Sequence, residues 1–153
     1  MYSNNLIIKI LDYIEININN KITIEELENH YFYNRFYIMK LFKKELNITI
    51  FDYINKLRIF NSLELFYSNE KIIKIALRNG FYSLEYYSEI FKKEIGISPR
   101  EYKRIILSNY YDQKRLKITN NLIKLNNIIG KINKYKQNKK PEQLPVKKLS
   151  IWN

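Results

Sequence analysis

The chain has no cysteine, and its single histidine is His30. The lack of cysteine excludes disulfides, thiolate nucleophiles and zinc sites built from Cys and His ligands. A glycine-rich phosphate loop and a nucleophile elbow are also missing, and the acidic residues are scattered along predicted helices. We therefore expect no enzyme, no metal site and no cofactor, and we interpret His30 as a surface or capping residue.

The N-terminal segment lacks a long uninterrupted apolar run. Lys9 and Asp12 interrupt its apolar residues, and no basic segment precedes them. This pattern fits neither a signal peptide nor a membrane-spanning helix. We expect a cytoplasmic protein.

Acidic residues are few compared with basic ones. The chain has 15 Asp and Glu against 27 Lys and Arg, a net charge of +12. Such an excess indicates a polyanionic partner, either nucleic acid or an anionic membrane surface. Residues 1–104 contain 16 of the basic and 13 of the acidic residues, whereas residues 105–153 contain 11 and 2. Most of the excess positive charge therefore belongs to the C-terminal part of the chain.

Apolar residues recur at helical spacing along most of the chain, and strand-like alternation is scarce. Thr23 with Glu26 forms a capping box, and Pro99 stands at the favoured first position of a helix. Gly80 and Gly96 follow predicted helix ends. These signals predict an all-α fold with helices at about 5–18, 23–31, 34–46, 50–67, 71–79, 83–95 and 98–107.

The chain also repeats itself. The segment "YIMKLFKKELNITIFDY" (37–53) matches "YYSEIFKKEIGISPREY" (86–102) at a spacing of 49 residues. Ahead of the predicted turn the spacing becomes 48, which pairs Phe32 with Gly80. The repeat predicts a duplicated unit, and each copy has two helices joined by a tight turn, the outline of a helix-turn-helix.

The two units differ at their turns. Gly80 supplies a left-handed backbone conformation, and Ala76 is small where two helices would cross. The first unit has Phe32 and Glu28 at the corresponding positions. A bulky residue in a left-handed turn is strained, so we predict that the first turn has a different shape or register.

The second unit carries the segment "IIKIALRNGFYSLEYYSEIFKKEIGISPREYKR" (72–104). It resembles the DNA-binding domain of AraC/XylS-family transcriptional regulators in its Ala, its Gly-Phe, its Ser cap, its Phe-Lys-Lys and its Gly-x-Ser-Pro-x-x-Tyr. The resemblance extends over about residues 6–106. It implies two helix-turn-helix subdomains joined by a long linking helix, with recognition helices at about 34–45 and 83–94 that enter successive major grooves. The implied parts are a first unit at 1–49, a linking helix at 50–67, a second unit at 68–107 and a basic extension at 108–153.

The resemblance implies DNA contacts from the outward side chains of both recognition helices. On the first helix we expect Lys40 to reach guanine, Phe36 and Met39 to pack against thymine methyls, and Arg35 and Lys43 to contact phosphates. On the second helix the corresponding residues are Leu84, Glu85, Ser88 and Glu89, followed by Lys92 and Lys93 as possible backbone contacts.

The carboxylates of Glu85 and Glu89 leave two alternatives for the second unit. A glutamate can accept a hydrogen bond from cytosine N4, and Ser88 can bond to several bases, which would permit specific reading. Repulsion between the carboxylates and DNA phosphates would instead weaken or prevent engagement by this half.

The resemblance implies double-stranded DNA as the partner. The chain resembles the small stand-alone members of the family, which act as monomers and activate transcription by contacting RNA polymerase. We therefore expect a sequence-specific transcriptional regulator that makes no membrane contact. The alternative is a degenerate, largely sequence-independent basic DNA-binding or protein-interaction protein, with its affinity carried by phosphate contacts and by the tail.

The C-terminal extension contains an apolar seam. Five apolar residues follow a 4-3-4-3 spacing, the pattern of a coiled-coil seam: Ile118, Leu122, Leu125, Ile129 and Ile132. A helix at about 118–136 could fold back on the domain, form a dimer, or belong to a mostly disordered segment. Residues 134–148 are basic and interrupted by proline, which predicts a flexible arm, and the last residues could be the stub of a lost effector domain.

Overall fold

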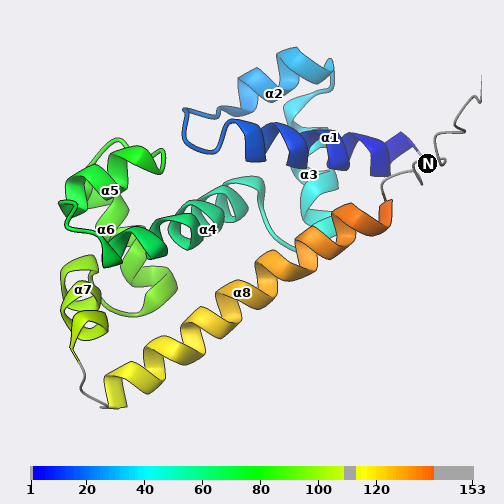
Figure 1. Ribbon diagram of the computed structural model, residues 1–153. Coiled ribbons are helices and arrows are strands. Elements are labelled where there is room, and N and C mark those ends of the chain that lie inside the picture. The colour runs from blue at the N-terminus through cyan, green and yellow to red at the C-terminus, as the bar shows by residue number, and fades with distance from the viewer. Residues whose placement is uncertain (1, 109–112, 140–153) are drawn as a thin grey trace, which may run out of the picture.

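The computed structural model describes residues 2–108 and 113–139, and the regular structure in these ranges is helical. Figure 1 shows two groups of helices, with α4 between them and a long helix, α8, across both. The elements are α1 (Tyr2–Ile16), α2 (Ile24–Tyr31), α3 (Arg35–Leu46), α4 (Ile50–Ser62), the 3-10 helix η1 (Leu63–Tyr67), α5 (Ile72–Arg78), α6 (Leu84–Ile95), α7 (Pro99–Leu107) and α8 (Gln113–Lys139). The prediction of an all-α fold is confirmed.

The first group consists of α1, α2, α3 and the first half of α4. Their apolar faces meet in one core, which contains Ile7, Leu27, Phe42 and Tyr53, each with no exposed side-chain surface. The capping box predicted at Thr23 is present, because the Thr23 hydroxyl accepts from the Glu26 amide and the Glu26 carboxylate accepts from the Thr23 amide.

The second group consists of the end of α4 with η1, α5, α6 and α7. A second core contains Ile59, Phe66, Phe91 and Tyr102. The two predicted glycine ends are also confirmed, because Gly80 and Gly96 have φ angles of 83° and 95°.

The linking segment differs from the prediction of one α-helix over 50–67. The α-helix ends at Ser62, and the chain continues as the tighter 3-10 turn of η1. The Ser62 hydroxyl bonds to the Ile59 carbonyl and to the Tyr87 hydroxyl at the change of winding. The tighter turn brings Phe66 into the second core, and this burial is a tertiary effect with no local sequence signal.

The helix α8 is longer than the predicted range of 118–136 and folds back on the domain. It packs against α1, α4 and α6 and runs from one end of the molecule to the other (Figure 1). Ile118, Leu125 and Ile129 of the seam enter the second core, and Ile132 enters the first. The apolar seam that could have formed a dimer interface is therefore covered by this chain's own helices.

Polar contacts hold the C-terminal end of α8 against the first group. Lys136 Nζ lies 2.5 Å from a carboxylate oxygen of Asp12 and 2.5 Å from one of Glu15. The Tyr135 hydroxyl donates to Glu45 at 3.1 Å, and burial together with this bond raises its pKa to about 12. The expected flexible arm beyond residue 139 lies outside the described residues.

None of the helices in the described residues combines the length and the apolar character needed to cross a membrane.

Candidate nucleic-acid interface

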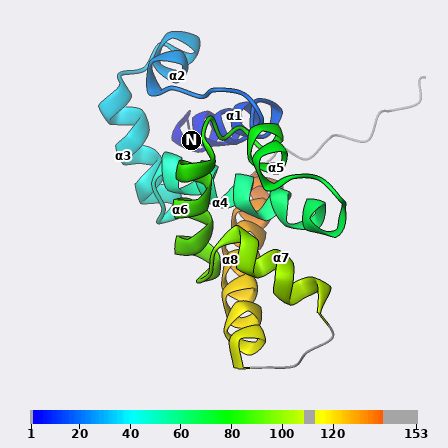
Figure 2. The same cartoon turned by 90° about the vertical axis from the view of Figure 1, so that its left-hand side faces the viewer.

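The two candidate reading helices lie on the same side of the molecule. In the view of Figure 2, α3 and α6 are on the left-hand side, while α5 and α7 are on the right. Each helix begins at a side-chain cap, Asn34 for α3 and Ser83 for α6. Each cap follows the tight turn of its unit, so the backbone path of the turn sets the orientation of the reading helix.

On α3, four of the five predicted contact residues are exposed. The exposed fraction is 74% for Phe36 and 43% for Met39, and Lys40 and Lys43 are also exposed. On the opposite side of α3, Ile38 and Phe42 are fully buried in the first core. The helix therefore presents lysines and two apolar side chains outward, which suits contacts to guanine and to thymine methyls.

Arg35, which the sequence suggested as a phosphate contact, is ion-paired within the first unit. Its guanidinium lies 2.8 Å from a Glu25 oxygen and 2.9 Å from a Glu28 oxygen, and its own amide donates to Glu28. The hydrogen bond to Glu28 is the main cause that raises the pKa of Arg35. Glu28, the residue at the position of the small Ala76, thus ties α2 to the start of α3.

The turn of the first unit differs in shape from the second, as predicted. Phe32 is left-handed with a φ of 59°, and its amide donates to the Glu28 carbonyl. Only Tyr33 separates Phe32 from the Asn34 cap, whereas two residues separate Gly80 from the Ser83 cap. The first turn is therefore one residue shorter, although it keeps a left-handed residue.

Exposed aromatic rings surround the start of α3, a feature that the sequence reading did not single out. Phe32 is 92% exposed, and Tyr33 and Tyr37 stack with ring centroids 5.5 Å apart. The spacing of Tyr33 and Tyr37, four residues apart across a helix start, could have indicated this pair. With Phe36 they form an aromatic surface next to Lys40.

On α6 the outward face is acidic. Glu85 and Glu89 are exposed, opposite the buried side that contains Tyr87 and Phe91. Leu84 and Ser88 lie together on one flank of the helix and line a pocket described below. In the last turn of α6, Lys92 is exposed, while the Lys93 ammonium lies 3.8 Å from Asp52 of α4.

Two basic residues of α4, also missed by the sequence reading, connect the units. Lys56 forms ion pairs with Asp52 and with Glu94 of α6, at 3.1 and 2.8 Å. Arg58 is 8% exposed and donates to the backbone carbonyls of Ile18 and Asn20 from the first unit. Its guanidinium also lies 5.9 Å from the centre of the Phe81 ring in the second turn, and burial lowers its pKa.

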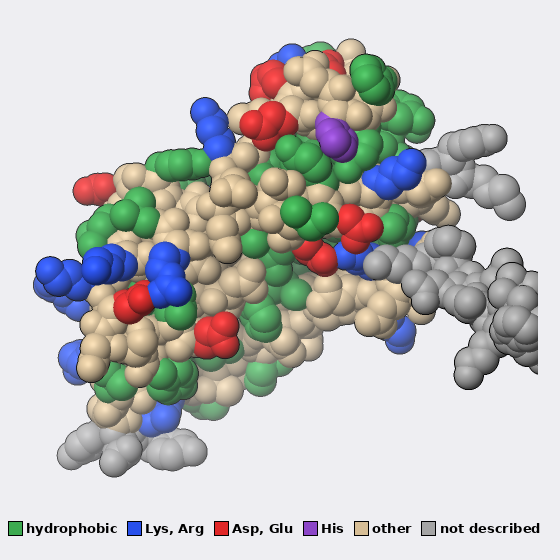
Figure 3. Space-filling view, turned by 45° about the horizontal axis from the view of Figure 1, so that its top comes forward, with side chains coloured by type: hydrophobic (Ala, Val, Ile, Leu, Met, Phe, Trp, Pro, Cys, Tyr) green, Lys and Arg blue, Asp and Glu red, His purple; other side chains and the backbone are tan. Residues whose placement is uncertain are grey.

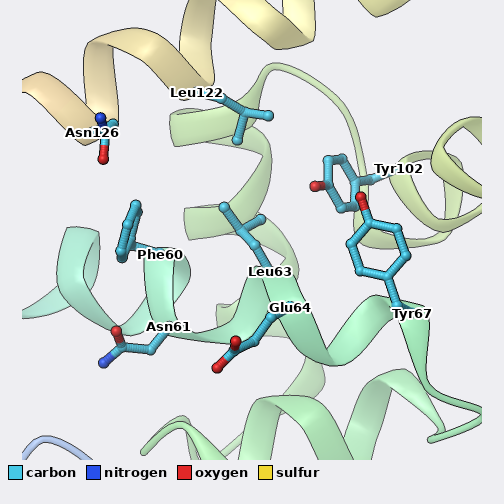
Figure 4. Close-up of a pocket in the computed structure, with 8 residues that line it drawn as sticks. All are labelled: Phe60, Asn61, Leu63, Glu64, Tyr67, Tyr102, Leu122 and Asn126. Carbon is cyan, nitrogen blue, oxygen red and sulfur yellow. The ribbon is translucent and has the colours of Figure 1, made fainter.

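A separate pocket of about 440 Å³ lies between η1 and α8. Figure 4 shows Phe60 and Leu63 directed toward Leu122 of α8, with Tyr67 and Tyr102 together at one end. None of the predicted DNA-contacting side chains lines this pocket. Its position marks a place where α8 is not fully packed against the linking segment.

The chain belongs to the helix-turn-helix domain family of the AraC type, and this family matches residues 27–105. The match covers α3, α6 and the helices between them, so it includes both reading helices. The segment α8 lies outside the matched residues.

Curated relatives are regulatory proteins by name. The transcriptional regulatory protein HptR of Staphylococcus aureus is 36% identical over 64 residues, 42% of this chain and 25% of its own length. A response regulatory protein of Staphylococcus epidermidis has the same identity over the same number of residues. The chain thus spans about a quarter of the length of these relatives.

Solved structures of similar domains agree with the fold. The C-terminal domain of AraT, a response regulator from Geobacillus stearothermophilus, has a TM-score of 0.63 at 28% identity, covering 71% of this chain and 92% of its own. The C-terminal domain of the response regulator yesN from Fusobacterium nucleatum has a TM-score of 0.58 at 27% identity, with coverages of 61% and 93%.

Proposed function

We propose that the protein is a sequence-specific DNA-binding transcriptional regulator whose reading helices, α3 and α6, enter successive major grooves. The observation that carries this proposal is that the chain contains both units of the family and that both reading helices lie on the same side of the molecule (Figure 2). Helices joined in this way read two half-sites about one turn of DNA apart.

The contacts between the units support reading by both helices at once. The first half of α4 belongs to one core and its last turns to the other. Arg58 bonds across the junction, and α8 contributes apolar residues to both cores. These contacts between the two units keep α3 and α6 in one relative position, as recognition of two adjacent grooves requires.

We assign the reading of the first half-site to Lys40, Phe36 and Met39, and a phosphate contact to Lys43. Arg35 has a different role, since its ion pairs with Glu25 and Glu28 position the start of α3. With Arg35 held in these ion pairs, the exposed lysines of α3 are Lys40, Lys43 and Lys44.

The proposal includes the state in which the protein acts. The apolar seam of α8 is used within the chain, which supports a monomer. We assign it a second partner, RNA polymerase, and a place in the cytoplasm, where the DNA of its bacterial relatives lies.

The experiment that tests this function is selection of bound sequences from a random duplex pool, performed with the full chain at two salt concentrations. The expected result is a motif with two half-sites about one helical turn apart, bound roughly 10³-fold or more tightly than random DNA. A motif with a single half-site would mean that only one of the two helices reads bases. Binding without any enriched sequence, and with a steep loss at high salt, would replace the proposal by sequence-independent binding.

A further inference from the structure

The charges of the two units are arranged in opposite ways. In the first unit the outward face of α3 is basic through Lys40 and Lys43, whereas in the second unit the outward face of α6 is acidic through Glu85 and Glu89. DNA phosphates border both faces if both helices read DNA. Glu85 and Glu89 lie in the first half of α6, whereas its exposed lysines, Lys92 and Lys93, lie in its last turn. A source of positive charge beside the start of the helix would therefore offset the two carboxylates.

A pocket of about 490 Å³ beside α6 supplies that charge. It lies between the starts of α5 and α7, and its walls include Lys71, Arg100 and Lys103 together with Leu84 and Ser88 of the reading helix. No carboxylate side chain lines it. Figure 3 shows basic side chains gathered at the end of the molecule that α5, α6 and α7 form.

The pocket lies on the outer flank of α6. Leu84 and Ser88 are four residues apart and so share one flank of the helix. The other flank faces α4, because Tyr86 bonds to Asn55 and Glu94 to Lys56. A DNA strand bordering the groove on the side away from the first unit would therefore pass over the pocket.

Two contacts keep the pocket in shape without neutralising it by a carboxylate. The Lys103 ammonium donates to the backbone carbonyl of Glu70 at 3.0 Å, which fixes α7 to the segment before α5. The Glu70 side chain is ion-paired with Arg78. Lys71 at the start of α5 and Arg100 at the start of α7 are both exposed and both line the pocket, so a bound anion could contact either cation.

The first unit lacks the three cations of this pocket. At the repeat spacings of 48 and 49 residues, the positions of Lys71, Arg100 and Lys103 are occupied by uncharged side chains: Thr23, Phe51 and Ile54. The three cations therefore belong to the second unit alone, the unit whose reading helix carries the two carboxylates.

We propose that this pocket binds a backbone phosphate of the DNA strand that borders the outer side of the groove entered by α6. Lys71 and Arg100 are the direct contacts, and Lys103 adds charge while positioning α7. The inference rests on the proposed function. Attraction at the flank offsets the repulsion by Glu85 and Glu89 and lets an acidic helix approach the bases, where its carboxylates select cytosine N4 groups.

The test compares Lys71→Gln and Arg100→Gln with the control variant Lys124→Gln. Lys124 is an exposed lysine of α8, and its substitution removes the same charge. Affinity for the selected duplex is measured over a range of salt concentrations. Each pocket variant should reduce the slope of log K against log salt by about 0.9, because one phosphate contact is lost. Arg100→Lys should retain the slope. Slopes for the two pocket variants that equal that of Lys124→Gln would overturn the proposal.

A second measurement locates the phosphate. Ethylation of single phosphates should weaken binding of the unaltered protein at one position beyond the second half-site, and the Arg100→Gln variant should become insensitive at that position. Sensitivity that stays at the same position in Arg100→Gln would also overturn the proposal. If the random pool gives no motif, the proposed function fails, whereas the salt slope on random duplex still decides whether the pocket contacts phosphate.

Discussion

Gly80 and Gly130 occupy different environments. Gly80 is left-handed, and an added Cβ would lie 2.7 Å from the Ile18 carbonyl and 2.8 Å from Arg58 Nε. An added Cβ on Gly130, within α8, would have no neighbour within 4 Å. One glycine is therefore required by its surroundings, and the other is replaceable.

The substitutions Gly80→Ala and Gly130→Ala should change stability in opposite directions. Gly80→Ala should lower the free energy of unfolding by at least about 2 kcal/mol, through left-handed strain and the displacement of Arg58. Gly130→Ala should raise it by about 0.5–1 kcal/mol, because alanine favours a helix interior. Urea unfolding of both variants checks this, and a Gly80→Ala variant as stable as the parent protein would contradict the described junction.

Lys40 is the exposed cation nearest the middle of α3. Lys40→Ala should weaken binding to the selected operator by about 1–3 kcal/mol and relax the preference at one base pair. The measurement is a competition assay against operators altered at each position, with Lys124→Ala as the control. An equal loss on random DNA would reassign Lys40 to a phosphate.

Glu85 and Glu89 decide how the second unit reads its site. If their carboxylates accept from cytosine, replacing both with alanine should reduce the affinity for the selected operator while that for random duplex rises. Titration of both duplexes at one salt concentration separates the two effects. Stronger binding to the operator as well would mean that the carboxylates only repel phosphate.

At the scale of helices, α8 contributes to the spacing of the two reading helices. Ile132 is 4% exposed within the core of the first unit, whereas Ile123 on the same helix is 53% exposed. Truncation of Ile132 would loosen only the end of α8 that holds α1, and would leave the contacts of α8 with the second unit. Ile132→Ala and Ile123→Ala therefore make the same substitution at a buried and at an exposed site of α8.

Ile132→Ala should increase the tolerance of the protein for altered half-site spacing. The parent protein should lose at least tenfold in affinity when one base pair is inserted between the half-sites, because insertion rotates and shifts the second site. Ile132→Ala should lose less, and Ile123→Ala should behave like the parent. Equal losses in all three proteins would mean that α4 alone holds the spacing.

Local signals in the sequence predicted most helix ends. The caps at Thr23, Asn34 and Ser83 depend on residues within three positions, and such patterns are readable from one sequence. The change from α4 to η1 was missed, because it depends on the burial of Phe66 against residues far along the chain. The ion pairs of Arg35 were missed because Glu25 and Glu28 belong to the preceding helix.

The candidate interface, too, was predictable only where its signal is local in the sequence. The outward positions of α3 and α6 could be read from helical spacing and from the repeat. The pocket of Lys71, Arg100 and Lys103 could not, since three helices bring its walls together. The path of α8 was left open among three alternatives, because an apolar seam does not specify which surface covers it.

At the scale of the whole molecule, the ends of the described chain meet. The Tyr135 hydroxyl bonds to Asn4, a separation of 131 residues, and Lys136 pairs with Glu15 across 121 residues. A contact between residues so far apart in the sequence costs little more loop-closure entropy than one over half that separation, but contacts of this kind form late in folding.

The order in which the ribosome makes the chain affects the contact between α8 and the first unit. A chain is made from its N-terminus, so the helices whose core receives Ile132 are made before α8. Until α8 leaves the ribosome, the first unit exposes apolar surface to water and to neighbouring chains. Arrival of α8 is then the step that completes both cores together, and it makes a prematurely terminated chain the form most exposed to aggregation and proteolysis.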